Sequence, residues 1–282
     1  MQHTLAQEIT FEGVGLHSGA KSVLTLRPAA ENSGIVFVRS DVENAKPVKA
    51  LYSNVVDTRN CTCLADENKN PISTIEHLMA ALSVMEIDNV VVEVSAPEMP
   101  IMDGAAEIFF NSLQEIGRVE QSAERKYLKI LKHVEFTDDK GNKIALDPSE
   151  EFEIHFTIEF PSKIVGHQEF YAKIDRETFA TKIAPCRTFC EKYQIDYLRS
   201  IGLIKGGSLD NAVVLDGETV LNPGGFKVKN ECVNHKVLDA LGDMYTAGFP
   251  LIGKLTADKT GHYHNNQILR VLFADKNNYE IR

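Results

Sequence analysis

The stretch Asn234–Asp243, NHKVLDALGD, carries one histidine and two aspartates at intervals of four residues. If the stretch is helical, residues four apart lie on one face, so His235 and Asp239 can bind a single ion together. Asp243 would lie about 12 Å along the axis from His235, where it could instead orient another catalytic group beside the ion. The apolar residues fall on the opposite face, so an amphipathic helix with a solvated polar face is the alternative.

A second helix is predicted at Ser73–Leu82, STIEHLMAAL, where apolar residues recur at i, i+3, i+4 and i+7. Its first turn holds Glu76 and His77. Zinc hydrolases use this combination, because a neutral imidazole binds the ion and an unliganded glutamate takes a proton from water. The alternative is structural, since Ser73 and Glu76 have the spacing of a capping box that closes a helix N-terminus.

A third candidate group lies in Lys259–Asn266, KTGHYHNN, which we predict to be a polar turn after a strand. Catalytic side chains often lie on such loops. His262 or His264 could protonate a leaving amine there, because the imidazole pKa lies near neutral pH. Surface histidines without a role are the alternative. The coincidence of the three groups carries more weight than any one of them.

Strands and helices follow one another in two similar series. In each half, strands precede a helix that begins near a histidine, and an apolar strand comes after that helix. We predict strands at 21–29, 33–40, 88–97, 127–136, 152–160, 211–217 and 250–258, and further helical segments at 105–117 and 176–183. The pattern predicts an α+β fold with two domains, 1–120 and 126–282, joined by a polar linker at 118–125 and with their helices facing one another.

Composition limits the class of protein. The chain has 282 residues, 43% hydrophobic and 25% charged, which is ordinary for a globular protein with room for two cores. No apolar run approaches the roughly 18 residues of a membrane span, and the N-terminus lacks the features of a secretory signal, so we expect a cytoplasmic protein. The net charge of −10 disfavours nonspecific binding to nucleic acid or anionic membranes. The five cysteines lack zinc-site spacing and are predicted to be reduced thiols.

Seven motifs occur in a fixed order: EGVGLHSG, STIEHLMAAL, IDNVVVEV, PIMDGAA, RTFC, HKVLDALGD and GHYHNN. Together they resemble the UDP-3-O-acyl-N-acetylglucosamine deacetylases, the zinc amidases of lipid A biosynthesis in Gram-negative bacteria. The resemblance covers about Gln2 to Arg270. It implies two domains of similar β-α-α-β topology, with helices sandwiched between two outer sheets and the active site at the domain junction.

The resemblance also implies a reaction and a cofactor. The reaction is hydrolysis of the N-acetyl amide of UDP-3-O-acyl-N-acetylglucosamine, which releases acetate and a free amine and is the committed step of lipid A biosynthesis. The zinc ligands would be His77, His235 and Asp239, although iron(II) suits the same ligands. Glu76 would be the general base.

Three further residues are implied to act in the chemistry. His262 would stabilise the oxyanion as a cation and protonate the departing amine. Asp243 would orient His262 and stabilise its charge, which gives the third acid of NHKVLDALGD a role. Thr188, in RTFC, would donate its hydroxyl to the oxyanion.

Contacts with the nucleotide and sugar are implied by the same resemblance. Lys236 and Lys259 look like the basic residues near the diphosphate. Phe189 resembles the ring that packs on the sugar, and Phe160 resembles the ring near the uracil.

The segment 191–214 resembles the insert that forms an apolar passage for the acyl chain, with Ile195, Leu203 and Leu209 as its aliphatic residues. Ordinary core packing is the alternative for these side chains. Asn211 departs from the pattern, because a smaller or more apolar residue is expected there, so the acyl-chain length is left open.

Two other functions stay open at this stage. The first is a zinc amidohydrolase that acts on another N-acylated nucleotide or sugar. The second is a non-catalytic protein that keeps a metal or nucleotide site. In every case we expect a small-molecule ligand, no nucleic acid, no membrane span and a monomer.

Overall fold

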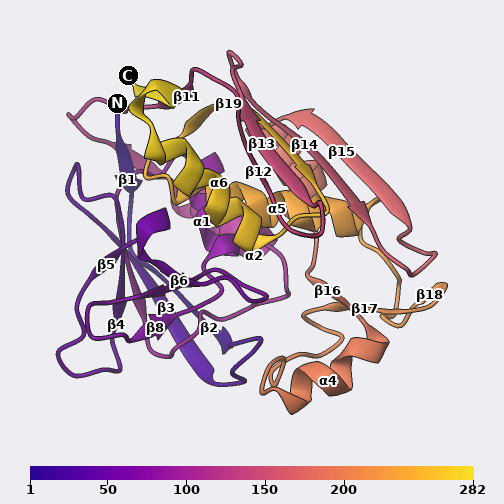
Figure 1. Ribbon diagram of the computed structural model, residues 1–282. Coiled ribbons are helices and arrows are strands. Elements are labelled where there is room, and N and C mark those ends of the chain that lie inside the picture. Colours follow the sequence, from indigo (N-terminus) through magenta and orange to yellow (C-terminus); the bar gives the residue numbers. More distant parts are fainter.

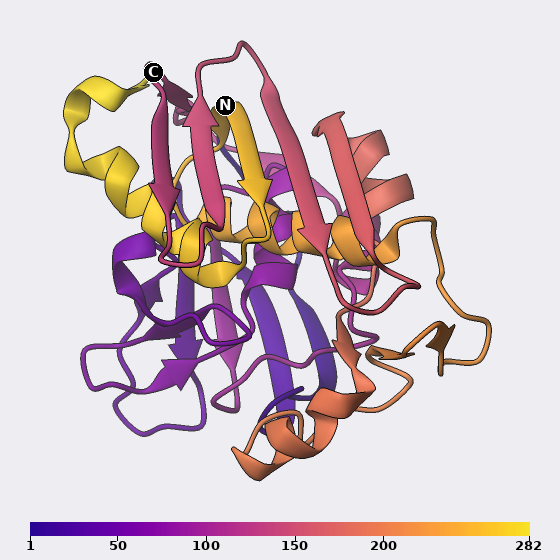
Figure 2. The ribbon, with the colours of Figure 1, turned by 45° about the vertical axis from the view of Figure 1, so that its right-hand side comes forward.

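The computed structural model describes residues 1–282, and its helices form a layer between two large sheets (Figures 1 and 2). The N-terminal sheet has the order β2-β3-β9-β4-β5. Its strands are β2 (Ile9–Val14), β3 (Lys21–Pro28), β4 (Ile35–Arg39), β5 (Val48–Lys49) and β9 (Val90–Val94). Buried and less buried residues alternate along β3, β4 and β9, because one face of the sheet packs on the helices. The strands predicted at 21–29, 33–40 and 88–97 are confirmed.

The C-terminal sheet has seven strands, with β19 at its centre beside β11, β13 and β14. The strands are β11 (Leu128–Ile130), β12 (Val134–Thr137), β13 (Lys143–Asp147), β14 (Phe152–Glu159), β15 (His167–Lys173), β19 (Leu251–Asp258) and β20 (Tyr279–Ile281). The predicted strands at 152–160 and 250–258 are confirmed, whereas 127–136 forms two short strands instead of one. Strands β13 and β15 were not predicted.

Four helices make up most of the middle layer, which confirms the α+β fold class. They are α1 (Glu76–Val84), α2 (Glu107–Ile116), α5 (Glu231–Tyr245) and α6 (His262–Ala274). Helix α2 ends at Gly117, whose φ of 73° is the left-handed conformation that glycine adopts without a steric penalty.

Helix α5 is buried almost all round. Of its 15 residues only Lys236 is not buried, so the alternative of a solvated polar face is wrong. A single hydrophobic core of 57 buried residues includes side chains from both sheets and from the helices between them. The two halves therefore share one core, and their division into domains at 120–126 stays a prediction.

The short strand β1 (His3–Leu5) pairs with β10 (Arg118–Glu120) in an antiparallel ladder. The first residues of the predicted linker at 118–125 are therefore a strand, and that part of the linker prediction is wrong. This pairing could not be predicted, because β10 has only three residues and all of them are exposed.

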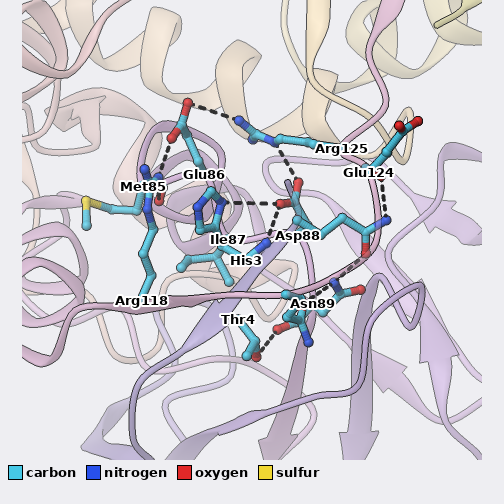
Figure 3. Close-up of polar contacts among 12 residues, drawn as sticks. His3, Thr4, Met85, Glu86, Ile87, Asp88, Asn89, Arg118, Glu124 and Arg125 are labelled. Carbon is cyan, nitrogen blue, oxygen red and sulfur yellow. Dashed lines mark hydrogen bonds and ion pairs between the residues drawn. The ribbon is translucent and has the colours of Figure 1, made fainter.

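A network of charged groups joins the N-terminal residues to the segment that links the two halves (Figure 3). Glu86 forms ion pairs with Arg118 and with Arg125. Asp88 accepts hydrogen bonds from Arg125 Nε at 2.8 Å and from the backbone N–H of His3 at 2.9 Å. The side chain of Arg125 is only 6% exposed, so this network fixes the course of the chain between the halves.

The remaining elements are short. They are β6 (Val55–Asp57), β7 (Cys63–Ala65), β8 (Pro71–Ile72), β16 (Phe189–Glu191), β17 (Val213–Asp216), β18 (Thr219–Val220), α3 (Arg176–Thr178), α4 (Ile195–Ser200), the π-helical turn Phe179–Ile183 and the 3-10 turns Tyr52–Asn54, Lys192–Gln194 and Lys276–Asn278. The helical segment at 176–183 and the strand at 211–217 are confirmed. No helix is both long and apolar enough to cross a membrane.

The turn predicted at 259–266 is wrong beyond Gly261, because His262 is the first residue of α6. The sequence did not indicate this helix, because the buried face of its first turns consists of polar residues. His262, His264 and Asn265 are buried in this first part, and the apolar residues Ile268, Leu269 and Leu272 follow only later.

Candidate active site

Helices α1 and α5 pack so closely that their backbones are in contact at Gly242. A Cβ atom at Gly242 of α5 would lie 2.0 Å from the carbonyl oxygen of Glu76, so only glycine permits this contact. The contact brings the first turn of α1, with Glu76 and His77, against the middle of α5. His77 therefore faces His235 and Asp239, which come from the other half of the chain.

The side chains of His77, His235 and Asp239 offer ligand atoms that all lie within 4.8 Å of one another. Asp239 Oδ1 is 3.7 Å from His77 Nε2 and 3.3 Å from His235 Nε2. The two imidazole centroids are 5.1 Å apart with the rings nearly perpendicular. Two nitrogens and one carboxylate oxygen around a common point are the donor set of a catalytic zinc or iron(II) site.

The protonation of the three groups fits a cation. Burial, with the neighbouring imidazole, lowers the pKa of His77 to about 3, and burial also lowers the pKa of His235. Burial would raise the pKa of Asp239, but its electrostatic interactions with His235 and Lys236 outweigh burial and lower that pKa well below its usual range. The group therefore holds two neutral imidazoles and one carboxylate at neutral pH.

Hydrogen bonding leaves the ligand atoms free. His235 Nδ1 lies 3.0 Å from the carbonyl oxygen of Cys186, which directs its Nε2 toward Asp239. Asp239 Oδ1 is buried and has no hydrogen-bond partner. An unpaired buried carboxylate oxygen is costly, and a cation between the imidazoles would satisfy it. The residues therefore fit a divalent metal ion.

Glu76 stands beside this group and does not cap α1. Its Oε2 accepts a hydrogen bond from the backbone N–H of Thr62 at 3.0 Å, while Ser73 donates its hydroxyl to Pro97 O. The capping-box alternative is therefore wrong. Burial raises the pKa of Glu76 to about 8, and the nearby carboxylates of Asp243 and Asp239 act in the same direction.

His262 completes the group from the first turn of α6. Its Nδ1 is 2.8 Å from Asp243 Oδ2, and its Nε2 is 3.9 Å from both Glu76 Oε1 and Asp239 Oδ2. Burial alone would lower the pKa of His262, but the charges of Asp243 and Glu76 outweigh it and raise the pKa to about 9. His262 therefore carries a proton on Nε2 that points toward Glu76 and Asp239.

Two residues that the sequence did not point to hold Asp243 in place. Thr62 donates its hydroxyl to Asp243 Oδ1 at 2.5 Å, and Asn265 donates its amide to Asp243 Oδ2 at 2.8 Å. Thr62 lies between Cys61 and Cys63, two of the cysteines that were predicted to be reduced thiols, and no role was predicted for Thr62 itself. All five cysteines are free, and four are buried.

A small polar cavity of about 30 Å³ lies in front of these groups, and a larger, partly apolar cavity of about 390 Å³ adjoins it. Both are lined by Thr188, Lys236 and His262. Lys236 Nζ donates to Asp239 Oδ2 at 2.9 Å and lies 5.8 Å from the centre of the Phe189 ring. Thr188 and Lys236 are therefore brought together with the predicted catalytic residues.

The larger cavity contains part of the predicted acyl passage. Ile195 and Leu209 line it, together with Phe189, but Leu203 does not. Asn211 is buried and not among the lining residues, and its side chain bonds to the backbone of Ser208 and Gly206. The departure at Asn211 therefore shapes the loop and does not narrow the cavity directly.

Two predicted substrate contacts lie outside both cavities. Phe160 packs edge-on behind Phe189, with ring centroids 5.2 Å apart. Lys259 is 43% exposed and lies 3.7 Å from Glu159 and 3.9 Å from Asp258. Neither residue lines the described cavities.

His17, to which the sequence assigned no role, lines both cavities. Its two ring nitrogens are buried and have no hydrogen-bond partner. Its backbone is fixed by Glu98, which accepts hydrogen bonds from the N–H groups of His17 and Ser18 and from the hydroxyl of Thr74. The glycine-rich motif EGVGLHSG thus forms a wall of the site.

Comparison with known proteins agrees with this geometry. The family described as UDP-3-O-acyl N-acetylglycosamine deacetylase matches residues 2–274. The chain is 44% identical to the UDP-3-O-acyl-N-acetylglucosamine deacetylase of Shewanella violacea, over 99% of this chain and 92% of that protein. It is also 44% identical to the protein of the same name from Phenylobacterium zucineum, over 100% of this chain and 96% of that protein.

The chain therefore belongs to the UDP-3-O-acyl N-acetylglycosamine deacetylase family. Members of the family are hydrolytic metalloenzymes, and the resemblance drawn from the seven motifs is confirmed. His77, His235 and Asp239 form the group in this chain that could hold the metal ion.

Proposed function

We propose that this protein hydrolyses the N-acetyl amide of UDP-3-O-acyl-N-acetylglucosamine, the committed step of lipid A biosynthesis. The observation that carries the proposal is the convergence of His77, His235 and Asp239 with Glu76 and His262 around one polar cavity that adjoins an apolar one. The reaction consumes one water molecule. Its oxygen bonds to the acetyl carbon, the carbon–nitrogen bond breaks, and a proton moves to the departing amine.

Glu76 and His262 divide the proton transfer. Glu76 takes a proton from the attacking water when it is ionised, and burial makes this carboxylate a stronger base than an exposed glutamate. His262 begins as the cation, stabilises negative charge that develops on the amide oxygen, and then gives its Nε2 proton to the leaving nitrogen. The pKa of His262 is raised, so the cation is available at neutral pH.

Asp243, Thr62 and Asn265 position His262. The Asp243 carboxylate accepts a hydrogen bond from the Nδ1–H of His262 and so directs Nε2 toward the cavity, while Thr62 and Asn265 fix the carboxylate. Thr188 lines the same cavity and is placed to donate its hydroxyl to the developing oxyanion.

We propose zinc as the metal ion, held by His77, His235 and Asp239, with iron(II) as the other ion that suits the same ligands. When bound, the ion would supply Lewis acidity that polarises the amide carbonyl and makes water more acidic. Lys236 shields Asp239 by pairing with its Oδ2 and leaves Oδ1 for the ion.

The remaining substrate contacts follow the two cavities. Lys236 and Phe189 would meet the diphosphate and the sugar beside the polar cavity, and Lys259 and Phe160 would lie farther out toward the nucleotide. The acyl chain would enter the apolar cavity, whose lining residues include Ile195, Leu198, Ile204, Leu209 and Val214.

The proposal extends to the setting of the enzyme. Five free cysteines suit a reducing compartment, so we place the enzyme in the cytoplasm. We propose a monomer, because the ligand trio, Glu76 and His262 all come from one chain.

The test combines metal analysis with an activity assay on the purified full-length protein. We expect about one zinc or iron ion per chain and release of acetate from the UDP-linked substrate. A metal-loaded protein that releases no acetate from this substrate would contradict the proposal. Hydrolysis of simple acetamides with the UDP sugar ignored would instead support an amidohydrolase of different specificity.

A further inference from the structure

The segment 192–205 carries a row of exposed apolar side chains. Tyr193, Tyr197 and Ile201 are spaced four residues apart, and they are 69%, 65% and 51% exposed. The segment runs through the 3-10 turn Lys192–Gln194 and α4, so this spacing puts the three side chains on one face. We call these three residues the outer stripe.

The outer stripe lies on the outside of the apolar cavity. Ile195, Leu198 and Ile204 of the same segment line the cavity from within. No residue of α4 is buried, and Figures 1 and 2 show α4 at the edge of the molecule. The exposed side chains Leu209 and Leu221 also line the cavity, so apolar surface continues from the stripe toward its mouth.

The charge of this segment is opposite to that of the chain. Between residues 192 and 205 there are three cations, Lys192, Arg199 and Lys205, and one carboxylate, Asp196, which leaves a net charge of +2. The whole chain has a net charge of −10. Lys192 pairs with Asp216, whereas Arg199 and Lys205 form no ion pair. The segment is thus a local cationic and apolar surface on an acidic protein.

We propose that the outer stripe docks on an anionic phospholipid surface. Tyrosine is favoured at the boundary between lipid and water, because its ring is apolar and its hydroxyl can stay in water. Lysine and arginine beside such a row attract acidic headgroups. The acidity of the rest of the chain restricts this docking to the one segment.

A second copy of the chain is a poorer occupant. Three side chains of this size cover on the order of 300–400 Å², whereas a stable protein interface buries about 800 Å² on each partner. A lipid surface needs no complementary pocket and accepts a small apolar row. Docking of the stripe would bring the mouth of the apolar cavity to the lipid boundary.

The experiment is flotation of the full-length protein with lipid vesicles, without substrate. Vesicles of phosphatidylcholine alone are compared with vesicles that also contain phosphatidylglycerol. We expect binding to the anionic vesicles and a loss of at least about tenfold in the partition coefficient for Tyr193→Ser/Tyr197→Ser/Ile201→Ser. Lys205→Gln should reduce binding to anionic vesicles about fivefold.

The matched control is Val56→Ser/Val119→Ser/Leu131→Ser, which removes three exposed apolar side chains elsewhere and should leave vesicle binding unchanged. Acetate release by the stripe variant from a soluble substrate should also be unchanged, which shows that it is folded. Equal binding by the stripe variant, or no binding by the natural sequence, would overturn the proposal. Concentration-dependent dimerisation that the variant abolishes, without vesicle binding, would also overturn it in favour of self-association. Vesicle binding and the oligomeric state do not depend on the proposed reaction, so they test the docking proposal separately from it.

Discussion

The α1–α5 contact and the segment 192–209 are opposite kinds of structure beside the same cavities. At the contact, 14 of the 15 residues of α5 are buried, and Gly242 touches the backbone of α1. In the segment, none of the six residues of α4 is buried. The groups proposed for chemistry are therefore held by the core, whereas the α4 side chains proposed to contact the acyl chain lie on a part of the protein that the core does not restrain.

The largest effect should come from the buried region. Glu76→Gln keeps the size of the side chain but removes the base, so we expect turnover to fall by about 10²–10⁴-fold. Metal content should stay the same, because Glu76 is not one of the three ligands. Acetate release and metal analysis on the same preparation check this. A fully active variant with its metal retained would disprove the assignment of Glu76.

Gly242→Ala tests the backbone contact itself. The added Cβ would meet the Glu76 carbonyl oxygen at 2.0 Å, so α1 and α5 must separate. We expect the free energy of unfolding to fall by about 2–4 kcal/mol, with activity reduced as well. Gly261→Ala is the control, because its Cβ meets nothing within 4 Å. Equal denaturation midpoints for the two variants would contradict the importance of the contact.

Asp243→Asn should change the pH dependence of turnover. Burial lowers the pKa of His262 and the Asp243 charge raises it, so loss of that charge must lower the pKa. In the proposed mechanism His262 is the acid and is active when protonated, so activity falls as pH rises through its pKa. The alkaline limb of the pH profile should therefore move to lower pH in Asp243→Asn. A limb that stays in place would show that His262 is not the acid.

The smallest effect should come from the exposed segment. Ile195→Ala/Leu209→Ala removes apolar surface from the cavity, so we expect KM for a long-chain substrate to rise about threefold to tenfold with kcat almost unchanged. Thermal stability should hardly change, because neither residue is buried. A large loss of stability would show that these side chains belong to the core, as the alternative from the sequence held.

The sequence predicted α1 and α5, two of the three helices of the site, because their apolar residues follow a clear period. The apolar spacing around His77 and the four-residue interval of His235 and Asp239 need only local geometry. The fold class and six strands were predicted for the same reason.

The sequence failed where polar residues point inward or contacts are long-range. The start of α6 was predicted to be a turn because its buried residues His262, His264 and Asn265 are polar and so interrupt the apolar period. Thr62 meets Asp243 across 181 residues of sequence, so no spacing could reveal it. The need for Gly242 depends on the crossing of two helices, which a single sequence does not specify.

The ligand trio also has a thermodynamic consequence. His77 belongs to the N-terminal half, whereas His235 and Asp239 belong to the C-terminal half, so any cation they share acts as a crosslink between the two. An ion that binds only the folded protein raises its free energy of unfolding, and tighter binding raises it further. A chelator that removes the ion should therefore lower both the activity of this enzyme and its free energy of unfolding.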